Sequence, residues 1–189
     1  LFIFPFLTYR VPELTRSLLR YRSRRLDRAR DAARAAGYQG AMFPWQSGSD
    51  GREETQVVHL NPESGHWLPD ASHLQRHINA AIAFNVWHYW GAEMLLEIAR
   101  FWASAATYNH HLDRYEIKGV MGPDEYHEGY VDRDEPGLDN NAYTNVMAVW
   151  CLLRAGDALE TVPPFRRSEL LEKLEVTHHE LDRWADISS

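Results

Sequence analysis

The chain has 189 residues, of which 44% are hydrophobic and 25% are charged, and its formal net charge is −7 at pH 7. This composition is ordinary for one soluble domain that buries a core, and it argues against intrinsic disorder. The longest strongly apolar run, 78–87, is interrupted by two asparagines and is shorter than the roughly 20 residues of a membrane span, so we expect no membrane partner.

The N-terminal segment LFIFPFLTYR has no basic region before it and no small-residue cleavage site after it, so it does not resemble a signal peptide. It also lacks an initiator Met, so we expect this sequence to be an internal part of a longer chain. Cys151 is the only cysteine, which leaves no internal disulfide. These features favour a cytoplasmic protein.

The first predicted helix spans 12–36, because Pro12 suits a first helical turn and Gly37 suits a C-terminal stop. From Arg10 to Arg34 there are nine arginines against three acids, a local charge of +6, so nucleic-acid binding is an alternative function. An apolar stripe on this helix places most of the arginines on the opposite, solvated face, with Arg22 and Arg25 as exceptions that need partners. The stripe consists of Leu14, Leu18, Tyr21, Leu26, Ala29, Ala33 and Ala36.

The rest of the chain reads mostly as helices and long loops. The expected elements are a loop over 38–72 with a short strand in TQVVHL, helices over 73–90 and 92–108, an acidic loop, a helix capped by Asn140 or Asn141 that runs to about residue 153, a Pro-Pro linker, and a helix over 168–184. This makes about five helices and almost no sheet. Loops of this length are uncommon unless they are functional.

The acidic loop lies in the run GVMGPDEYHEGYVDRDEPGLDNNAYTN, residues 119–145, which has seven acids within sixteen positions. Neighbouring carboxyl groups disfavour joint ionisation, so the pKa of one of them rises above the reference value of about 4.3 for Glu. A Glu that stays protonated near neutral pH is a general acid, which glycosidic bond cleavage requires. Seven Trp and nine Tyr offer aromatic faces for a sugar.

Two other interpretations of polar residues are weaker. The acid spacing in the loop does not match an EF-hand calcium motif, although a merely solvated surface stays open on composition. The adjacent pairs His110–His111 and His178–His179 are poor joint ligands, because neighbours on a helix point about 100° apart. We therefore expect no metal site.

The segment GPDEYH together with DNNAYTN resembles the catalytic segment of glycoside hydrolase family 65. The resemblance implies that Glu125 is the general acid. For Asp124 and His127 two roles stay open: orienting Glu125 or the sugar hydroxyls, and forming hydrogen bonds that fix the loop. GAMFPWQSGSDGREET and HINAAIAFNVWHYW resemble further family segments, although Ala81 replaces a common Asp. The implied substrate-binding residues are Trp45, Gln46, Asp124, His127, Asn141 and Tyr143.

The resemblance implies an all-α fold, in which residues 1–189 form part of a catalytic (α/α)₆ barrel with long active-site loops. With about five of twelve helices present, we expect self-association or a large exposed apolar surface. The implied reaction is single-step inversion at an α-glucosidic bond of maltose, trehalose or kojibiose. Hydrolysis and phosphorolysis both stay open; inorganic phosphate is the co-substrate of the latter, and no cofactor is expected. A catalytically incomplete carbohydrate-binding module is the alternative.

Overall fold

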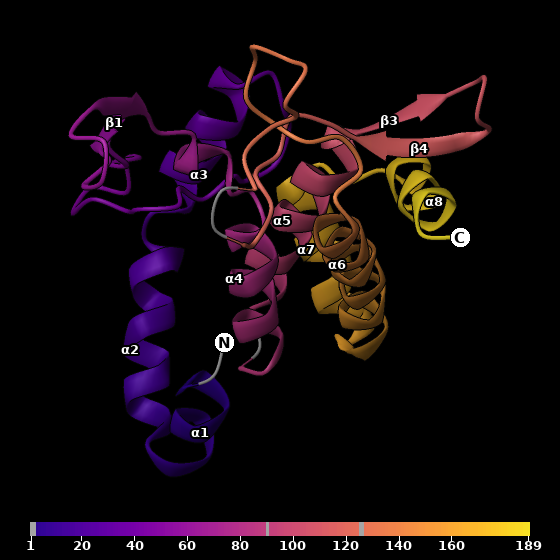
Figure 1. The fold of residues 1–189 in the computed structure, drawn as a ribbon. Coiled ribbons are helices and arrows are strands. Elements are labelled where there is room, and N and C mark those ends of the chain that lie inside the picture. Colours follow the sequence, from indigo (N-terminus) through magenta and orange to yellow (C-terminus); the bar gives the residue numbers. More distant parts are fainter. Residues whose placement is uncertain (1–2, 90, 125–126) are drawn as a thin grey trace.

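The computed structural model describes residues 3–89, 91–124 and 127–189, and most of them are helical (Figure 1). The helices are α1 (Ile3–Arg10), α2 (Pro12–Ser23), α3 (Leu26–Ala35), the 3₁₀ helix η1 (Ser72–Leu74), α4 (Ile78–Trp87), α5 (Ala92–Ala105), α6 (Ala142–Thr161), α7 (Pro164–Leu174) and α8 (His178–Ile187). Two antiparallel hairpins pair β1 (Val58–Leu60) with β2 (Trp67–Pro69) and β3 (Ala106–Asn109) with β4 (Arg114–Ile117). No helix in the described ranges is long and apolar enough to cross a membrane.

The predicted helix over 12–36 is wrong in one respect, because it is two helices that meet at Arg24 and Arg25. The Arg25 guanidinium donates to the carbonyl oxygen of Tyr21 at 2.9 Å and, through Nε, to that of Ser49 at 3.0 Å. A carbonyl released by the end of α2 is thus satisfied by a side chain, as helix termini require. The Ser49 carbonyl belongs to a distant loop, and the sequence does not reveal this partner of Arg25.

Two further predicted helices are shorter than expected. Helix α5 ends at Ala105, and its expected last turn instead forms β3, where Tyr108 faces Tyr115 across the hairpin with ring centroids 5.1 Å apart. The helix over 168–184 is broken at Glu175, which adopts a left-handed conformation with φ of 54°. The count of about five helices is therefore too low, because breaks within predicted helices and the helix α1 were missed.

The predicted helix over 73–90 is also shorter, because residues 72–74 form η1 and α4 spans only Ile78–Trp87. The predicted strand and helix cap are confirmed. Strand β1 lies within the TQVVHL segment. Asn141 caps α6 by accepting a hydrogen bond from the amide of Thr144 at 3.0 Å, although α6 continues to Thr161 rather than ending near residue 153.

Helix α5 forms the centre of the core and packs against α4, α6 and α8. It buries side chains around most of its circumference, because it is covered from several directions. Its buried residues are Met94, Leu95, Leu96, Glu97, Ile98, Ala99, Phe101, Trp102 and Ala103. In Figure 1 this helix lies behind α4 and α6.

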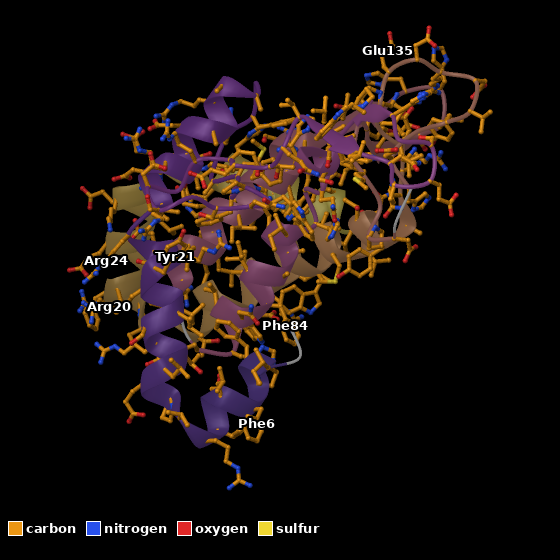
Figure 2. The ribbon with its side chains drawn as sticks, turned by 60° about the vertical axis from the view of Figure 1, so that its left-hand side comes forward. Phe6, Arg20, Tyr21, Arg24, Phe84 and Glu135 are labelled. Carbon is orange, nitrogen blue, oxygen red and sulfur yellow. The ribbon has the colours of Figure 1, made fainter. Side chains whose placement is uncertain are left out.

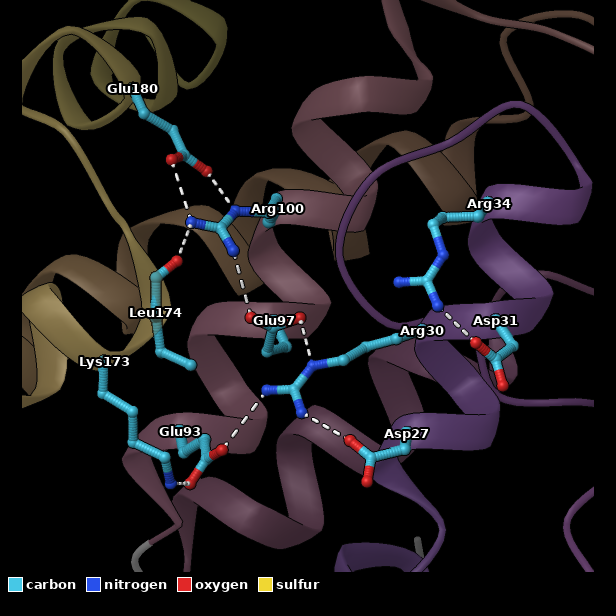
Figure 3. Close-up of polar contacts among 10 residues, drawn as sticks. All are labelled: Asp27, Arg30, Asp31, Arg34, Glu93, Glu97, Arg100, Lys173, Leu174 and Glu180. Carbon is cyan, nitrogen blue, oxygen red and sulfur yellow. Dashed lines mark hydrogen bonds and ion pairs between the residues drawn. The ribbon is translucent and has the colours of Figure 1, made fainter.

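A network of ion pairs fastens α3, α7 and α8 to α5 (Figure 3). The Glu97 carboxylate, 3% exposed as a residue, bonds Arg30 at 3.1 Å and Arg100 at 3.0 Å. Arg100 also bonds both carboxylate oxygens of Glu180, at 2.6 and 3.1 Å. Burial lowers the pKa of Arg100, but the hydrogen bond and charge of Glu180 and the charge of Glu97 outweigh burial and raise it.

The network bears on the nucleic-acid alternative. Arg30 and Arg34 pair with carboxylates, and Arg28 lies 3.9 Å from Asp31. Arg20 and Arg24 do point away from the rest of the chain (Figure 2). The charge that this stretch offers to a phosphate backbone is therefore smaller than its sequence predicts, and the structure does not favour that alternative.

The predicted apolar stripe of the first helix is only partly correct. Leu26, Ala29 and Ala33 are buried, but Leu14 and Leu18 of α2 are exposed. Together with α1, helix α2 projects from the rest of the molecule and presents large apolar side chains to solvent (Figure 1). These exposed side chains are Ile3, Phe6, Tyr9, Val11, Leu14 and Leu18. Self-association through them stays a prediction.

Candidate functional site

A cavity of about 520 Å³ lies where four loop segments meet beside the start of α4. Its lining is mixed aromatic, acidic and polar, which is the character of a site for a hydroxyl-rich ligand. The residues that line it are Trp45, His59, Asp70, Ser72, Gln75, Met121, Pro123, Asp124 and Glu128. Residues from the GAMFPW segment and from the acidic loop thus share one wall, as the family resemblance predicts.

The Trp45 side of the wall is held by one carboxylate. Glu53 accepts hydrogen bonds from the amides of Trp45 at 2.8 Å and Gln46 at 3.0 Å. The Thr55 hydroxyl donates to the same carboxylate at 2.5 Å. A carboxylate that accepts several backbone amides fixes a loop without regular secondary structure. The conformation of the Trp45 segment is therefore set by a residue eight positions further along the chain.

Two longer-range contacts fasten this loop to helices. The Tyr21 hydroxyl of α2 donates to the Gly48 carbonyl at 2.7 Å. Asn79 of α4 is fully buried; its side-chain oxygen accepts the amide of Phe43 at 2.7 Å, and its nitrogen donates to the carbonyl of Arg76 at 2.9 Å. Buried polar side chains with satisfied bonds specify one arrangement of the chain. The cavity wall is thus positioned by α2 and α4.

The acidic loop begins and ends at a short bridge. Val120 and Leu138 exchange backbone hydrogen bonds of 3.1 and 2.7 Å, and the Met121 amide donates to the Leu74 carbonyl at 2.9 Å. The Gly122 amide donates to the His127 carbonyl at 2.8 Å. A Cβ at Gly122 would overlap the exposed His127 imidazole, which would have to move to accommodate it. The loop therefore enters and leaves at anchored positions.

Carboxylates that are crowded in the sequence are spread along this loop in space. Asp124 and Glu128 line the cavity, whereas Asp139 pairs with Arg133 at 3.1 Å. Glu135 lies at the far tip of the loop (Figure 2). Glu125, the predicted general acid, lies outside the described residues. A second cavity of about 810 Å³, between the β1–β2 hairpin and this loop, shares three lining residues with the first: His59, Asp70 and Glu128.

The site also contains a histidine that was not singled out from the sequence. His77, 8% exposed, packs between Trp45 and Tyr143 with ring centroids 5.7 Å away on each side. Burial lowers the pKa of His77, with the Met121 backbone acting in the opposite direction, so the imidazole is neutral at neutral pH. The available signal was its place at the start of HINAAIAFNVWHYW, which resembles a family segment.

The six described residues predicted to bind substrate take up different positions. Trp45 and Asp124 line the 520 Å³ cavity, whereas Gln46 and His127 are exposed beside it. Tyr143 is half-buried and contacts His77. The side-chain oxygen of Asn141 is engaged in capping α6. Substrate binding by these residues stays a prediction.

Other chemistry is limited within the described ranges. Among residues 3–89, 91–124 and 127–189, no cluster of three or more His, Cys, Asp or Glu is arranged to hold a metal ion. Cys151 is a buried free thiol, and burial raises its pKa strongly, which disfavours a thiolate nucleophile.

The sequence profile of the "Glycosyl hydrolase family 65 central catalytic domain" matches residues 1–189. The chain belongs to glycosyl hydrolase family 65. This confirms the resemblance seen in the GPDEYH and GAMFPW segments. Family 65 membership agrees with a cavity in which those two segments meet.

Individual family 65 relatives are similar over nearly the whole chain. An uncharacterized glycosyl hydrolase of Mycobacterium tuberculosis is 52% identical over all of the chain and 15% of its own length. A kojibiose phosphorylase of Halothermothrix orenii is 38% identical over 97% of the chain and 25% of its own length. A solved structure from the human microbiome, provisionally named kojibiose phosphorylase, has a TM-score of 0.78 at 26% identity and covers 98% of the chain. The chain spans about a quarter of that structure and less of the Mycobacterium relative.

Proposed function

We propose that this chain supplies the general-acid side of an active site that cleaves an α-glucosidic bond of a disaccharide by phosphorolysis, within an (α/α)₆ barrel. The observation that carries this proposal is the 520 Å³ cavity, whose wall joins Trp45 to Pro123 and Asp124. Glu125 follows directly in the sequence. An aromatic face and a carboxyl group beside one cavity are the two groups that a glycosidase or phosphorylase needs.

In this mechanism the Glu125 carboxyl gives its proton to the glycosidic oxygen as the bond to the anomeric carbon breaks. The bonding electron pair goes to that oxygen. A phosphate oxygen attacks the anomeric carbon from the opposite face, so an α-glucoside becomes β-glucose 1-phosphate. Phosphorolysis needs no second catalytic carboxylate. The names of the Halothermothrix relative and of a trehalose 6-phosphate phosphorylase of Lactococcus lactis, 43% identical, support phosphorolysis over hydrolysis.

The test uses the complete protein that contains this chain, incubated with phosphate and with kojibiose, trehalose or maltose. We expect β-glucose 1-phosphate, detected by ³¹P and ¹H NMR, and its loss in Glu125→Gln with an unchanged circular dichroism spectrum. Asp132→Asn is the matched control, because Asp132 is exposed in the same loop and is not among the residues lining either cavity. It should keep wild-type turnover.

Other outcomes separate the alternatives. Release of free glucose without phosphate would indicate a hydrolase. Binding of a disaccharide by the wild-type protein without turnover would indicate a carbohydrate-binding module. Full turnover by Glu125→Gln would refute the assignment of the general acid.

A further inference from the structure

His77 lies where three segments meet behind the cavity wall. Trp45 belongs to the loop after α3, His77 precedes the first residue of α4, and Tyr143 lies in the first turn of α6. The Trp45 and His77 rings are tilted by 58°, and the His77 and Tyr143 rings meet edge to face at 80°. Both centroid separations fall within the range of favourable aromatic pairs, 4.5 to 7 Å.

The three rings have different relations to the cavity. Of the three, Trp45 lines it, whereas His77 and Tyr143 do not. His77 therefore lies behind the wall, with the indole on one side and the phenol on the other. Its Nδ1 is buried and has no hydrogen-bond partner among the described residues. The aromatic contacts of the His77 ring are with the Trp45 and Tyr143 rings.

We propose that His77 is a positioning residue that holds the Trp45 indole against the substrate cavity and that Tyr143 acts on substrate only through His77. The inference rests on the proposed function, because it assigns Trp45 to the sugar-binding wall. It changes the expected role of Tyr143 from a residue that touches substrate to one that supports a ring that does.

Kinetics of the complete protein test the proposal through variants of His77 and Tyr143. His77→Ala removes both ring contacts and should raise the KM for the disaccharide about five- to tenfold with little change in kcat, as loss of uniform binding does. His77→Phe restores a ring without nitrogen and should bring the KM back to within about twofold of the wild type. Tyr143→Ala removes the ring that supports His77, so it should raise the KM by less than His77→Ala does, and it should raise the KM no further in a His77→Ala background.

The matched control is His88→Ala, the same substitution just after the other end of α4. His88 is exposed, and its ring packs on Phe84, with centroids 4.3 Å apart, rather than beside the cavity. This variant should keep the wild-type KM. In a Trp45→Ala background, His77→Ala should raise the KM no further, because the two changes remove one interaction. Additive effects would mean that His77 acts independently of Trp45, and they would overturn the proposal.

A readout without turnover separates this inference from the proposed function. The complete protein labelled with 5-fluorotryptophan gives a ¹⁹F resonance for Trp45, identified by its absence in Trp45→Phe. It should shift or broaden in His77→Ala and stay in place in His88→Ala. An unmoved resonance, a wild-type KM in His77→Ala, or a His77→Phe variant as impaired as His77→Ala would overturn the proposal. A rise in KM from Tyr143→Ala that persists in the His77→Ala background would assign Tyr143 a direct contact with substrate and would overturn its supporting role. Loss of turnover in every protein, wild type included, would instead refute the proposed function.

Discussion

Polar side chains on the two sides of α5 differ in whether they have partners. Beside α3, α7 and α8, the Glu97 carboxylate is enclosed between two guanidinium groups, and Arg100 has partners on α5, α7 and α8. Beside the start of α4, the Asp124 and Glu128 carboxylates line the cavity, and His77 lies behind its wall. Groups that satisfy one another fix the fold, whereas groups left unsatisfied at a cavity can act on a ligand. The network is therefore structural, and the wall is where we expect the chemistry to occur.

The largest effect should come from removing the centre of the network. Glu97→Ala leaves Arg30 and Arg100 without their shared partner, and loss of one side of a buried ion pair costs about 3–5 kcal/mol. We expect a markedly lower midpoint in urea unfolding. Glu169→Ala is the matched control, because Glu169 pairs with Arg166 at 3.0 Å but both side chains are more than half exposed. It should change stability by less than about 1 kcal/mol.

A pair of glycines tests how closely the loop after α3 approaches α5. Gly40 has a φ of +71°, and an added Cβ would lie 2.6 Å from the amide nitrogen of Phe101. Gly37 has a φ of +82° but nothing within 4 Å of that position. Both Ala variants carry backbone strain of about 1–3 kcal/mol, and Gly40→Ala adds a backbone overlap. Gly40→Ala should lower the thermal midpoint clearly more than Gly37→Ala; equal shifts would contradict the close approach.

Asn141 tests the boundary between structure and function at the start of α6. Asn141→Ala removes the N-cap and should cost about 1 kcal/mol. Asn141→Asp keeps an acceptor for the Thr144 amide but loses the side-chain NH₂ group. If capping is the whole role of Asn141, Asn141→Asp keeps both stability and turnover. If Asn141 also binds substrate, Asn141→Asp keeps stability and raises the KM.

The smallest expected effect is a pH dependence of stability. The folded protein holds the pKa of His77 below its ordinary value of 6.5, because burial disfavours the charged ring. Below about pH 6.5 the unfolded chain takes up a proton that the folded protein does not, so this residue lowers stability as the pH falls toward its folded pKa. Above pH 6.5 it contributes no slope. Urea titrations from pH 7 to pH 5 should show a shallower decline for His77→Phe than for the wild type.

Two of the residues that line the candidate site, Trp45 and Asp124, were named from the sequence because they lie in short distinctive segments, whereas His59, Asp70 and Gln75 were not. The GPDEYH and GAMFPW segments predicted that Trp45 and Asp124 belong to one site, and the two residues do line one cavity. The cap at Asn141 was also predictable, because an Asn side chain reaches an amide three positions away. Each of these signals is either local or a recognisable family segment.

Other features depend on residues far apart in the sequence. At the break between α2 and α3, Arg25 donates a hydrogen bond to the Ser49 carbonyl. The apolar periodicity of the sequence does not predict that bond. The apolar stripe placed Leu14 and Leu18 inside, yet both are exposed. The sequence did not distinguish His77 from other histidines near helix starts, because its contacts with the Trp45 and Tyr143 rings exist only in the folded protein.

The sequence by itself determined the family, the largely helical character and two of the segments that line the cavity. These features depend on local propensity and on motifs of neighbouring residues, which can be read without the fold. Only the tertiary structure decided where helices break, which carboxylates are paired and which side chains face the cavity. Those outcomes depend on burial and on contacts between distant residues, where the free energy of satisfying a polar group or packing a ring outweighs the preferences of the local segment.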